Sequence, residues 1–291
     1  MDHPTPAGIA YLPHIPTPES IIFSDFDGTY LLPSPNPERT PATDALESYL
    51  QQECLPQRLL FGWITGSSLD NVAQKSMRYS LRLWPHFIAG ALGTQLWMFS
   101  QEHGAVQEPM WEQRMTESGF SQEKTDTIVA ALSRDGIRLV AQASHNQGPR
   151  KVAYYYFMDT PERDARAKER TLQLVEDFGL TVHFARCGVG VGDPNNCYDV
   201  DFTPRGSGKK AIVDHLLSIW NIPQDRTAAF GDSQNDKTML DTVAHGFVVA
   251  NAEESIKQDH YTILQAPGPA GILDGLRHIT ANSQPQHLAQ P

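Results

Sequence analysis

The sequence predicts an α/β protein with a doubly wound, Rossmann-like parallel-sheet core into which a second α/β unit is inserted. Short apolar runs alternate with amphipathic segments along the chain, the pattern of parallel strands joined by helices. Acidic or Ser/Thr/Gly clusters follow directly after several of these runs, as expected where parallel strands end at a ligand crevice. The pattern changes near residue 103 and changes back near 198. We therefore expect a core of residues 1–102 and 199–291 and an inserted unit of residues 103–198.

In the first half of the core, apolar runs give strands and the segments between them give helices. The expected strands are residues 21–24, 59–64, 86–89 and 94–99, and the expected helices are residues 43–52 and a segment from Ser67 or Ser68 to Met77. The first 18 residues carry five prolines and predict an extended arm.

The inserted unit and the second half of the core follow the same rules. For the insert we expect helices at 122–133 and 162–178 and strands at 137–142, 152–158 and 181–186. For the returning core we expect strands at 198–203, 227–230 and 246–250 and a helix at 210–220. The last eleven residues, ANSQPQHLAQP, predict a disordered tail.

Composition argues against several classes of protein. The net charge is -11, from 23 basic and 34 acidic side chains, and there is no Lys/Arg-rich block, so neither nucleic acid nor an anionic membrane is an expected partner. We find no secretory signal and no apolar stretch of about 20 residues, which predicts a cytoplasmic protein. The three cysteines share no metal-ligand spacing and predict reduced thiols. The sequence leaves the oligomeric state open.

The most informative motif is Asp25-Phe26-Asp27-Gly28-Thr29, directly after the first predicted core strand. Two carboxylates two residues apart can serve one site if Gly28 lets the backbone fold tightly. Asp25 then suits a nucleophile that attacks phosphorus, and Asp27 suits the acid and base that serves the leaving oxygen and the water. Taken alone, the motif is also compatible with a solvated Asx turn.

A second acidic motif, Gly231-Asp232-Ser233-Gln234-Asn235-Asp236, follows another apolar strand. Mg²⁺ prefers oxygen ligands and keeps several waters, so Asp25, the Asp27 carbonyl and Asp232 form a sufficient protein set. Asp236 joins this metal site through water or as a support. The alternative is an Asn-Asp cap at a helix N-terminus.

Two further features suit an anionic substrate. Thr65-Gly66-Ser67 offers a hydroxyl and exposed amides where a helix begins, which can hold phosphate or simply cap the helix. Lys209 could bind a phosphate oxygen and offset charge in the transition state, although a single lysine is usually solvated. The run GSGKK around it is not a P-loop, because Thr203 and Lys210 stand where Gly and Ser/Thr are required.

Together these groups resemble the motifs of the haloacid dehalogenase superfamily: DFDGT at 25–29, ITGSS at 64–68, Lys209, and GDSQND at 231–236. The inserted unit is similar to the large α/β cap of that superfamily. The resemblance implies a Mg²⁺-dependent phosphatase of small sugar phosphates, with Asp25, Asp27 and Lys209 catalytic. It also implies a phosphate site at Thr65, Gly66, Ser67 and Asn235.

Four segments are similar to the relatives of sucrose-phosphatase that act on kanosamine 6-phosphate, which is 3-amino-3-deoxyglucose 6-phosphate. They are residues 61–68, 84–94, 192–209 and 229–236. Arg150-Lys151-Val152 resembles a sugar-contacting segment of sucrose-phosphatases, with Ala153 in place of its Ser. These likenesses imply hexose 6-phosphate hydrolysis, and they make Lys151, Asp193, Asp199 and Asp201 candidate sugar contacts.

The aspartates of the cap suit an aminosugar, because carboxylates pair with an ammonium and accept hydroxyl hydrogen bonds. They suit a neutral sugar nearly as well, and Asp199 and Asp201 can also be read as the polar face of an exposed strand. Three other functions stay open at this stage: another sugar phosphatase, a phosphohexomutase, and a binding protein that kept the fold.

Overall fold

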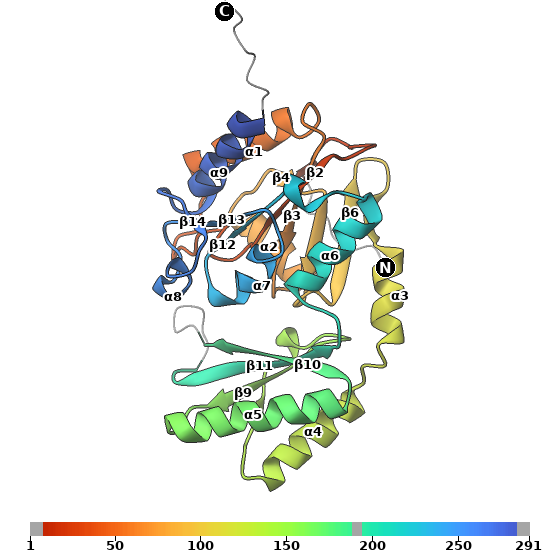
Figure 1. The fold of residues 1–291 in the computed structure, drawn as a ribbon, viewed down its shortest axis with the longest axis vertical. Coiled ribbons are helices and arrows are strands. Elements are labelled where there is room, and N and C mark those ends of the chain that lie inside the picture. Colours follow the sequence, from red (N-terminus) through yellow and green to blue (C-terminus); the bar gives the residue numbers. More distant parts are fainter. Residues whose placement is uncertain (1–7, 188–193, 284–291) are drawn as a thin grey trace, which may run out of the picture.

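A computed structural model describes residues 8–187 and 194–283. Its larger sheet has eight strands in the order β14-β13-β12-β2-β3-β5-β6-β7 (Figure 1). The strands from β14 to β5 run parallel, and β6 and β7 are antiparallel additions at one edge. Their bounds are β2 Ser20–Ser24, β3 Leu59–Ile64, β5 Phe87–Gly90, β6 Gln95–Ser100, β7 Gly104–Gln107, β12 Thr227–Gly231, β13 His245–Val248 and β14 Thr262–Ile263. The predicted doubly wound core is confirmed.

Helices cover this sheet and close its core. Their bounds are α1 Pro41–Glu53, α2 Leu69–Arg78, α3 Pro109–Glu117, α6 Lys209–Trp220, α7 Lys237–Leu240, α8 Glu254–Lys257 and α9 Gly268–Ser283. The central strand β3 is buried along its whole length. Short 3₁₀ turns precede β12, at Gln224–Arg226, and follow it, at Gln234–Asp236. Among the described residues, no helix is long and apolar enough to cross a bilayer.

The inserted unit is a four-stranded antiparallel sheet in the order β10-β11-β9-β8. Its elements are α4 Gln122–Arg134, β8 Val140–Ala141, a 3₁₀ turn at Ser144–Asn146, β9 Val152–Phe157, α5 Pro161–Asp177, β10 Leu180–Arg186 and β11 Cys197–Pro204. Helices α4 and α5 pack on the face of this sheet turned away from the core (Figure 1). The opposite face of the cap sheet is therefore turned toward the core.

The boundaries of the inserted unit differ from the predicted residues 103 and 198. Strand β7 pairs with β6 in the core sheet, and Trp111 and Met115 of α3 are buried in the core cluster. Strand β11 is paired on both sides within the cap sheet. The cap therefore lies between residues 118 and 204, because α3 buries its apolar side against the core.

The two ends of the chain also differ from expectation. Ala10–Tyr11 forms β1, which pairs in parallel with β4 at Leu83–Trp84, and Leu12 and Ile15 are buried. The expected arm is thus packed against the core. Residues 281–283, predicted as the start of a disordered tail, are the last turn of α9, and the rest of that tail lies outside the described residues.

Candidate active site

The predicted chemical groups meet where the parallel strands of the core sheet end, which we call the carboxyl edge of the sheet. Asp25 follows β2, Thr65 follows β3 and Asp232 follows β12. These three strands are adjacent and parallel, so their carboxyl ends lie side by side. The backbone N–H of Asp25 donates to the carbonyl of Phe230 at 2.9 Å, which joins the first acidic motif to the strand before the second.

Lys209 lies between two of the carboxylates. It is the first residue of α6 and is 7% exposed, and its Nζ is 2.6 Å from Asp25 Oδ1 and 2.5 Å from Asp236 Oδ1. Burial opposes the charged ammonium, but Asp236 and Asp25 outweigh it and raise the pKa of Lys209. Lys209 therefore stays cationic where a phosphate would approach.

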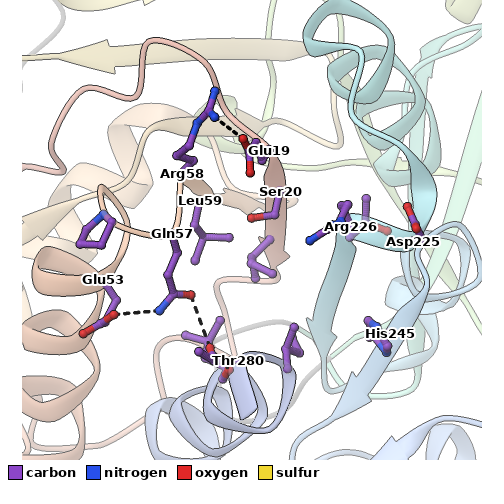
Figure 2. A pocket seen from close by; sticks show the side chains of 15 residues that line it. Glu19, Ser20, Glu53, Gln57, Arg58, Leu59, Asp225, Arg226, His245 and Thr280 are labelled. Carbon is purple, nitrogen blue, oxygen red and sulfur yellow. Dashed lines mark hydrogen bonds and ion pairs between the residues drawn. The ribbon is translucent and has the colours of Figure 1, made fainter. Parts of the chain in front are cut away.

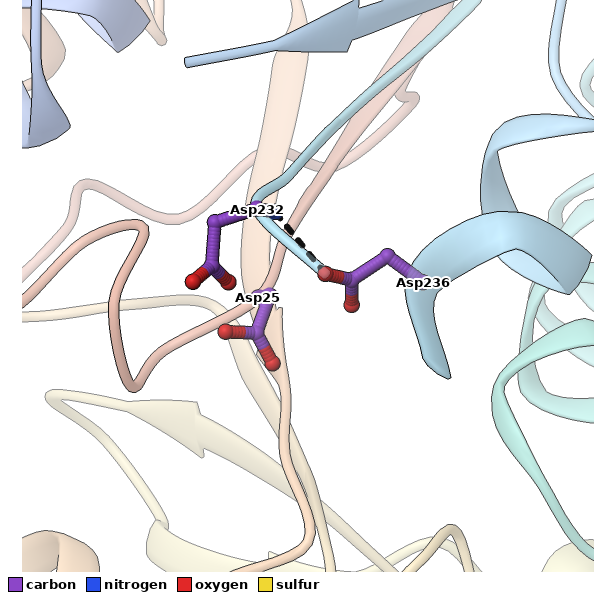
Figure 3. A group of neighbouring side chains, drawn as sticks. All are labelled: Asp25, Asp232 and Asp236. Atoms are coloured by element: carbon purple, nitrogen blue, oxygen red, sulfur yellow. Dashed lines mark hydrogen bonds between the residues drawn. The ribbon is translucent and has the colours of Figure 1, made fainter. Parts of the chain in front are cut away.

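Asp25, Asp232 and Asp236 form an acidic cluster in which each contributes one oxygen within 4.8 Å of the others (Figure 3). Burial, opposed by Lys209 and reinforced by Asp236 and Asp232, raises the pKa of Asp25. Burial and the nearby Asp236 raise the pKa of Asp232 to about 6. Three carboxylates share one ammonium here, so the all-oxygen cluster fits a divalent cation that would offset the two remaining charges.

Asp236 has a different position in this cluster from Asp25 and Asp232. Its Oδ2 accepts the backbone N–H groups of Asp232 and Ser233 at 2.9 and 3.0 Å, and its Oδ1 faces Lys209. A Cβ at Gly231 would lie 2.5 Å from the Asp236 Cβ, so only glycine permits this turn. With both oxygens engaged, Asp236 is better suited to orient Asp232 and Lys209 than to bind metal directly.

Gly28 lets the first acidic motif pass close to the second. Its φ is +93°, and a Cβ there would lie 2.2 Å from Asp232 Oδ2. Thr29 Oγ1 donates to Asp232 Oδ1 at 3.0 Å. Asn251, which the sequence analysis did not single out, donates from Nδ2 to the Gly28 carbonyl at 2.7 Å and accepts the N–H of Gly268. The turn that carries both aspartates is therefore held by hydrogen bonds with Asp232 and Asn251.

Asp27 lies with the Thr65–Ser67 turn. Its Oδ2 accepts from Ser67 Oγ at 3.0 Å and from Thr65 Oγ1 at 3.4 Å, and its Oδ1 is 2.6 Å from Lys75 Nζ. Lys75 also donates to Ser67 Oγ at 3.1 Å. Lys75 could not be predicted from the sequence, because a lysine in the second turn of a helix looks like any surface lysine.

The remaining predicted phosphate-site residues lie around these groups. Gly66 lies under Leu92, whose Cδ2 would be 3.3 Å from a Cβ on Gly66. Asn235 is exposed, and its Oδ1 accepts from Ser233 Oγ at 3.0 Å. The structure thus places Asn235 on the same turn as Asp232 without a contact to the other carboxylates, and its role stays a prediction.

Polar groups of the cap gather on the sheet face that is turned to the core. Asp201 is 9% exposed, and its Oδ1 is 3.4 Å from Lys151 Nζ without hydrogen-bond geometry. Burial and the nearby Asp199, opposed by Lys151, raise the pKa of Asp201 to about 6. Asp199 accepts from Gln142 Nε2 at 2.7 Å. The fourth predicted contact, Asp193, lies outside the described residues.

His183 is a cap residue that the sequence analysis missed. It is the register partner of Asp201, and a Cβ on Gly208 would lie 3.7 Å from its Cε1. Burial and Lys151 lower the pKa of His183 to about 4, so the ring is neutral at pH 7. Its Nε2 is buried without a hydrogen-bond partner. The alternation of His183 with Val182 and Phe184, which pack in the cap core, was the available signal.

A cavity of about 420 Å³ lies at the opposite edge of the core sheet, where β2 and β12 begin (Figure 2). Arg58 and Glu19 pair at its rim, and Arg226, Asp225 and His245 line another side. No lysine is among the residues that line this cavity. The combination of carboxylates with a buried lysine, which phosphoryl transfer would use, lies at the carboxyl edge of the sheet instead.

The comparison with known families agrees with this geometry. The family model described as sucrose-6F-phosphate phosphohydrolase matches residues 18–280. The chain belongs to this family. Kanosamine-6-phosphate phosphatase of Bacillus subtilis is 35% identical over 263 residues, which cover 90% of this chain and 93% of that protein. The predicted membership of the haloacid dehalogenase superfamily is thereby confirmed, and the chain is a phosphatase.

Solved structures show the same fold. A haloacid dehalogenase-like hydrolase from Bacillus subtilis matches with a TM-score of 0.75 and 33% identity, over 94% of this chain and 96% of that one. The sucrose-phosphatase of Synechocystis, solved with sucrose and phosphate, matches with a TM-score of 0.70 over 91% of this chain and 99% of that one. At 20% identity the second likeness concerns the fold alone.

Proposed function

We propose that this phosphatase hydrolyses a hexose 6-phosphate, with kanosamine 6-phosphate as its preferred substrate, through a phosphorylated Asp25 and with Mg²⁺. One observation carries the chemistry: a buried ammonium, Lys209, is in contact with Asp25 and Asp236 at the strand edge that also presents Asp232. A nucleophilic carboxylate needs such neighbours, because an anion must otherwise attack a dianionic phosphate.

The reaction has two displacements at phosphorus. In the first, an Asp25 oxygen bonds to phosphorus, the bond from phosphorus to the sugar oxygen breaks, and Asp27 gives that oxygen its proton. In the second, Asp27 takes a proton from water, the water oxygen bonds to phosphorus, and the bond to Asp25 breaks. Inorganic phosphate leaves and both aspartates return to their first state.

Several residues hold the transferring group without reacting. Lys209 binds one phosphate oxygen, and Thr65, Gly66, Ser67 and Asn235 bind the others through hydroxyl, backbone N–H and amide groups. Asp25, the Asp27 carbonyl and Asp232 would hold Mg²⁺, with Asp236 orienting Asp232. When bound, the cation offsets the negative charge shared by Asp25 and the phosphate.

The identity of the sugar is supported by the relative and by the cap. The kanosamine-6-phosphate phosphatase of Bacillus subtilis is 35% identical over 90% of this chain, and this likeness supports kanosamine 6-phosphate as the substrate. Asp201 and His183 carry buried polar atoms that lack hydrogen-bond partners. Such atoms gain most from a bound ligand that supplies hydroxyl or ammonium groups. Asp199 and Lys151 lie next to Asp201 and complete a polar face.

A phosphate-release screen tests the proposal. The purified protein with Mg²⁺ is given kanosamine, glucosamine, glucose and sucrose 6-phosphates, and we expect the highest kcat/KM with kanosamine 6-phosphate. Higher kcat/KM with a neutral sugar would overturn the substrate assignment. Accumulation of an isomerised ester in place of free phosphate would identify a mutase, and absence of turnover with every ester would reject the hydrolysis of hexose 6-phosphates.

A further inference from the structure

Helix α3 touches both parts of the molecule. Its core side is fixed, because Trp111 is 1% exposed and its Nε1 donates to the carbonyl of Gly93 at 3.1 Å. Glu108 caps the helix and lies 2.7 Å from Nε2 of His215 on α6. A Cβ on Gly93 would lie 2.8 Å from the backbone nitrogen of Gly208, the residue before Lys209. Helix α3 is therefore joined to the turn that places the catalytic lysine.

The other side of α3 binds the cap. Glu112 and Arg150 form a two-pronged ion pair, with distances of 2.9 Å from Nη1 to Oε2 and 2.5 Å from Nη2 to Oε1. Thr116 Oγ1 accepts a third hydrogen bond from Arg150 at 2.9 Å. The Arg150 side chain is 20% exposed and that of Glu112 is 35% exposed. Paired, planar contacts of this kind fix a direction as well as a distance.

Arg150 belongs to the turn that begins strand β9. Gly148 and Lys151 exchange backbone hydrogen bonds of 2.9 and 3.4 Å, with Pro149 and Arg150 between them. Proline restricts the backbone of such a turn. The direction of the Lys151 side chain is thus coupled to the anchoring of Arg150, and Lys151 lies 3.4 Å from Asp201. A change at Arg150 should reach the polar face of the cap through its immediate neighbour.

We propose that Arg150 is a positioning residue whose contacts with Glu112 and Thr116 hold the cap against α3 and set Lys151 and Asp201 for the sugar. The proposal rests on the proposed function. It assigns substrate affinity to an ion pair that touches neither the phosphate nor the catalytic aspartates. The effect should therefore depend on whether the substrate carries a sugar.

The test compares two substrates, a hexose 6-phosphate and p-nitrophenyl phosphate, which has no sugar hydroxyls. For Arg150→Gln and Glu112→Gln we expect KM for the hexose 6-phosphate to rise about tenfold or more, the usual effect of losing a charge-assisted contact. The kcat/KM for p-nitrophenyl phosphate should stay within about threefold, and the double variant should be no worse than either single one. Arg150→Lys keeps the charge but cannot form the two-pronged contact, so its KM for the hexose 6-phosphate should lie between those of the wild type and Arg150→Gln.

Arg163→Gln is the matched control, because Arg163 forms an exposed ion pair with Asp159 inside the cap. It should behave as the wild type. Two results for Arg150→Gln would overturn the positioning role. One is a KM for the hexose 6-phosphate within twofold of wild type, and the other is an equal fall in kcat/KM with both substrates.

Hydrogen exchange separates this proposal from the proposed function. Arg150→Gln should speed exchange of the linker amides at residues 118–121 and 205–208, whatever the substrate turns out to be. If the wild type hydrolyses p-nitrophenyl phosphate but no hexose 6-phosphate, the substrate assignment fails, while faster exchange in Arg150→Gln still supports the role of Arg150 in holding the cap against α3. Unchanged exchange in the linkers rejects it.

Discussion

The proposed catalytic edge of the core, where the parallel strands end, and the polar face of the cap differ in how their charges are satisfied. At the edge, Lys209 contacts two carboxylates, and both oxygens of Asp236 are engaged. On the cap face, His183 Nε2 is buried without a hydrogen-bond partner, and Asp201 Oδ1 makes a 3.4 Å ion pair with Lys151 but no hydrogen bond. The edge is therefore organised before substrate binds, whereas the cap face has polar groups left for the substrate to satisfy.

This contrast separates the two parts of the function. Phosphoryl transfer depends on fixed charges at short distances, and those charges sit on turns that the parallel strands of the sheet define. In the proposed function, substrate choice depends on cap groups that gain a hydrogen-bond partner only in the complex. Changes at the edge should consequently lower turnover of every phosphate ester, and changes on the cap face should act on particular sugars.

The largest effect is expected for Asp25→Asn. The amide is not a nucleophile, so kcat should fall by about 10⁴-fold or more with sugar esters and with p-nitrophenyl phosphate alike. Phosphate release measures the loss, and a thermal melt close to that of the wild type shows that the fold is kept. Turnover within tenfold of wild type would remove Asp25 from the role of nucleophile.

Gly28→Ala should have the next largest effect. Its Cβ would lie 2.2 Å from Asp232 Oδ2 at a φ of +93°, so the acidic cluster must shift. A displacement near 1 Å can cost about 10²-fold in kcat. Gly136→Ala is the matched control, since Gly136 also has positive φ but nothing within 4 Å of a Cβ. Both variants should lose about 1 kcal/mol or more of unfolding free energy from backbone strain, and only Gly28→Ala should lose activity.

Asp201→Asn tests the cap side. Loss of one charge-assisted contact to the ammonium should raise KM for kanosamine 6-phosphate by about 10–100-fold, with a smaller rise for glucose 6-phosphate. The pKa of Asp201 is raised to about 6, so the carboxyl is neutral below that pH and charged above it. KM for the aminosugar should therefore fall as pH rises from 5 to 7 in the wild type, and less so in Asp201→Asn. Equal changes for both sugars would contradict an ammonium contact.

The sequence was most informative where local motifs follow buried strands. Asp25, Asp232 and Thr65 could be placed together because each follows an apolar run, and parallel strands bring such positions to one edge. Lys75 and Asn251 could not be placed, because their contacts join residues from different elements that no short motif links.

Among the helices that were not predicted, α9 and α3 were missed for physical reasons that the structure makes plain. Helix α9 contains glycines that look like turn residues, but a Cβ on Gly275 would lie 2.5 Å from the ring of Phe230. Gly275 thus allows close packing of the helix against the sheet. Helix α3 is short and mostly polar, and its assignment to the core depends on Trp111 and Met115, whose burial follows from tertiary packing.

The smallest effect is expected for Lys75→Met. Lys75 Nζ lies 2.6 Å from Asp27 Oδ1, but the two side chains are 38% and 40% exposed, so solvent screens the pair. Without it Asp27 loses one of the contacts that orient its carboxyl, and kcat should fall about three- to tenfold with little change in KM. Lys210→Met, which removes an exposed lysine beside Lys209, should match the wild type. A loss as large as that of Asp25→Asn would instead mean that Lys75 binds the phosphate itself, and unaltered kcat would mean that Ser67 and Thr65 suffice to orient Asp27.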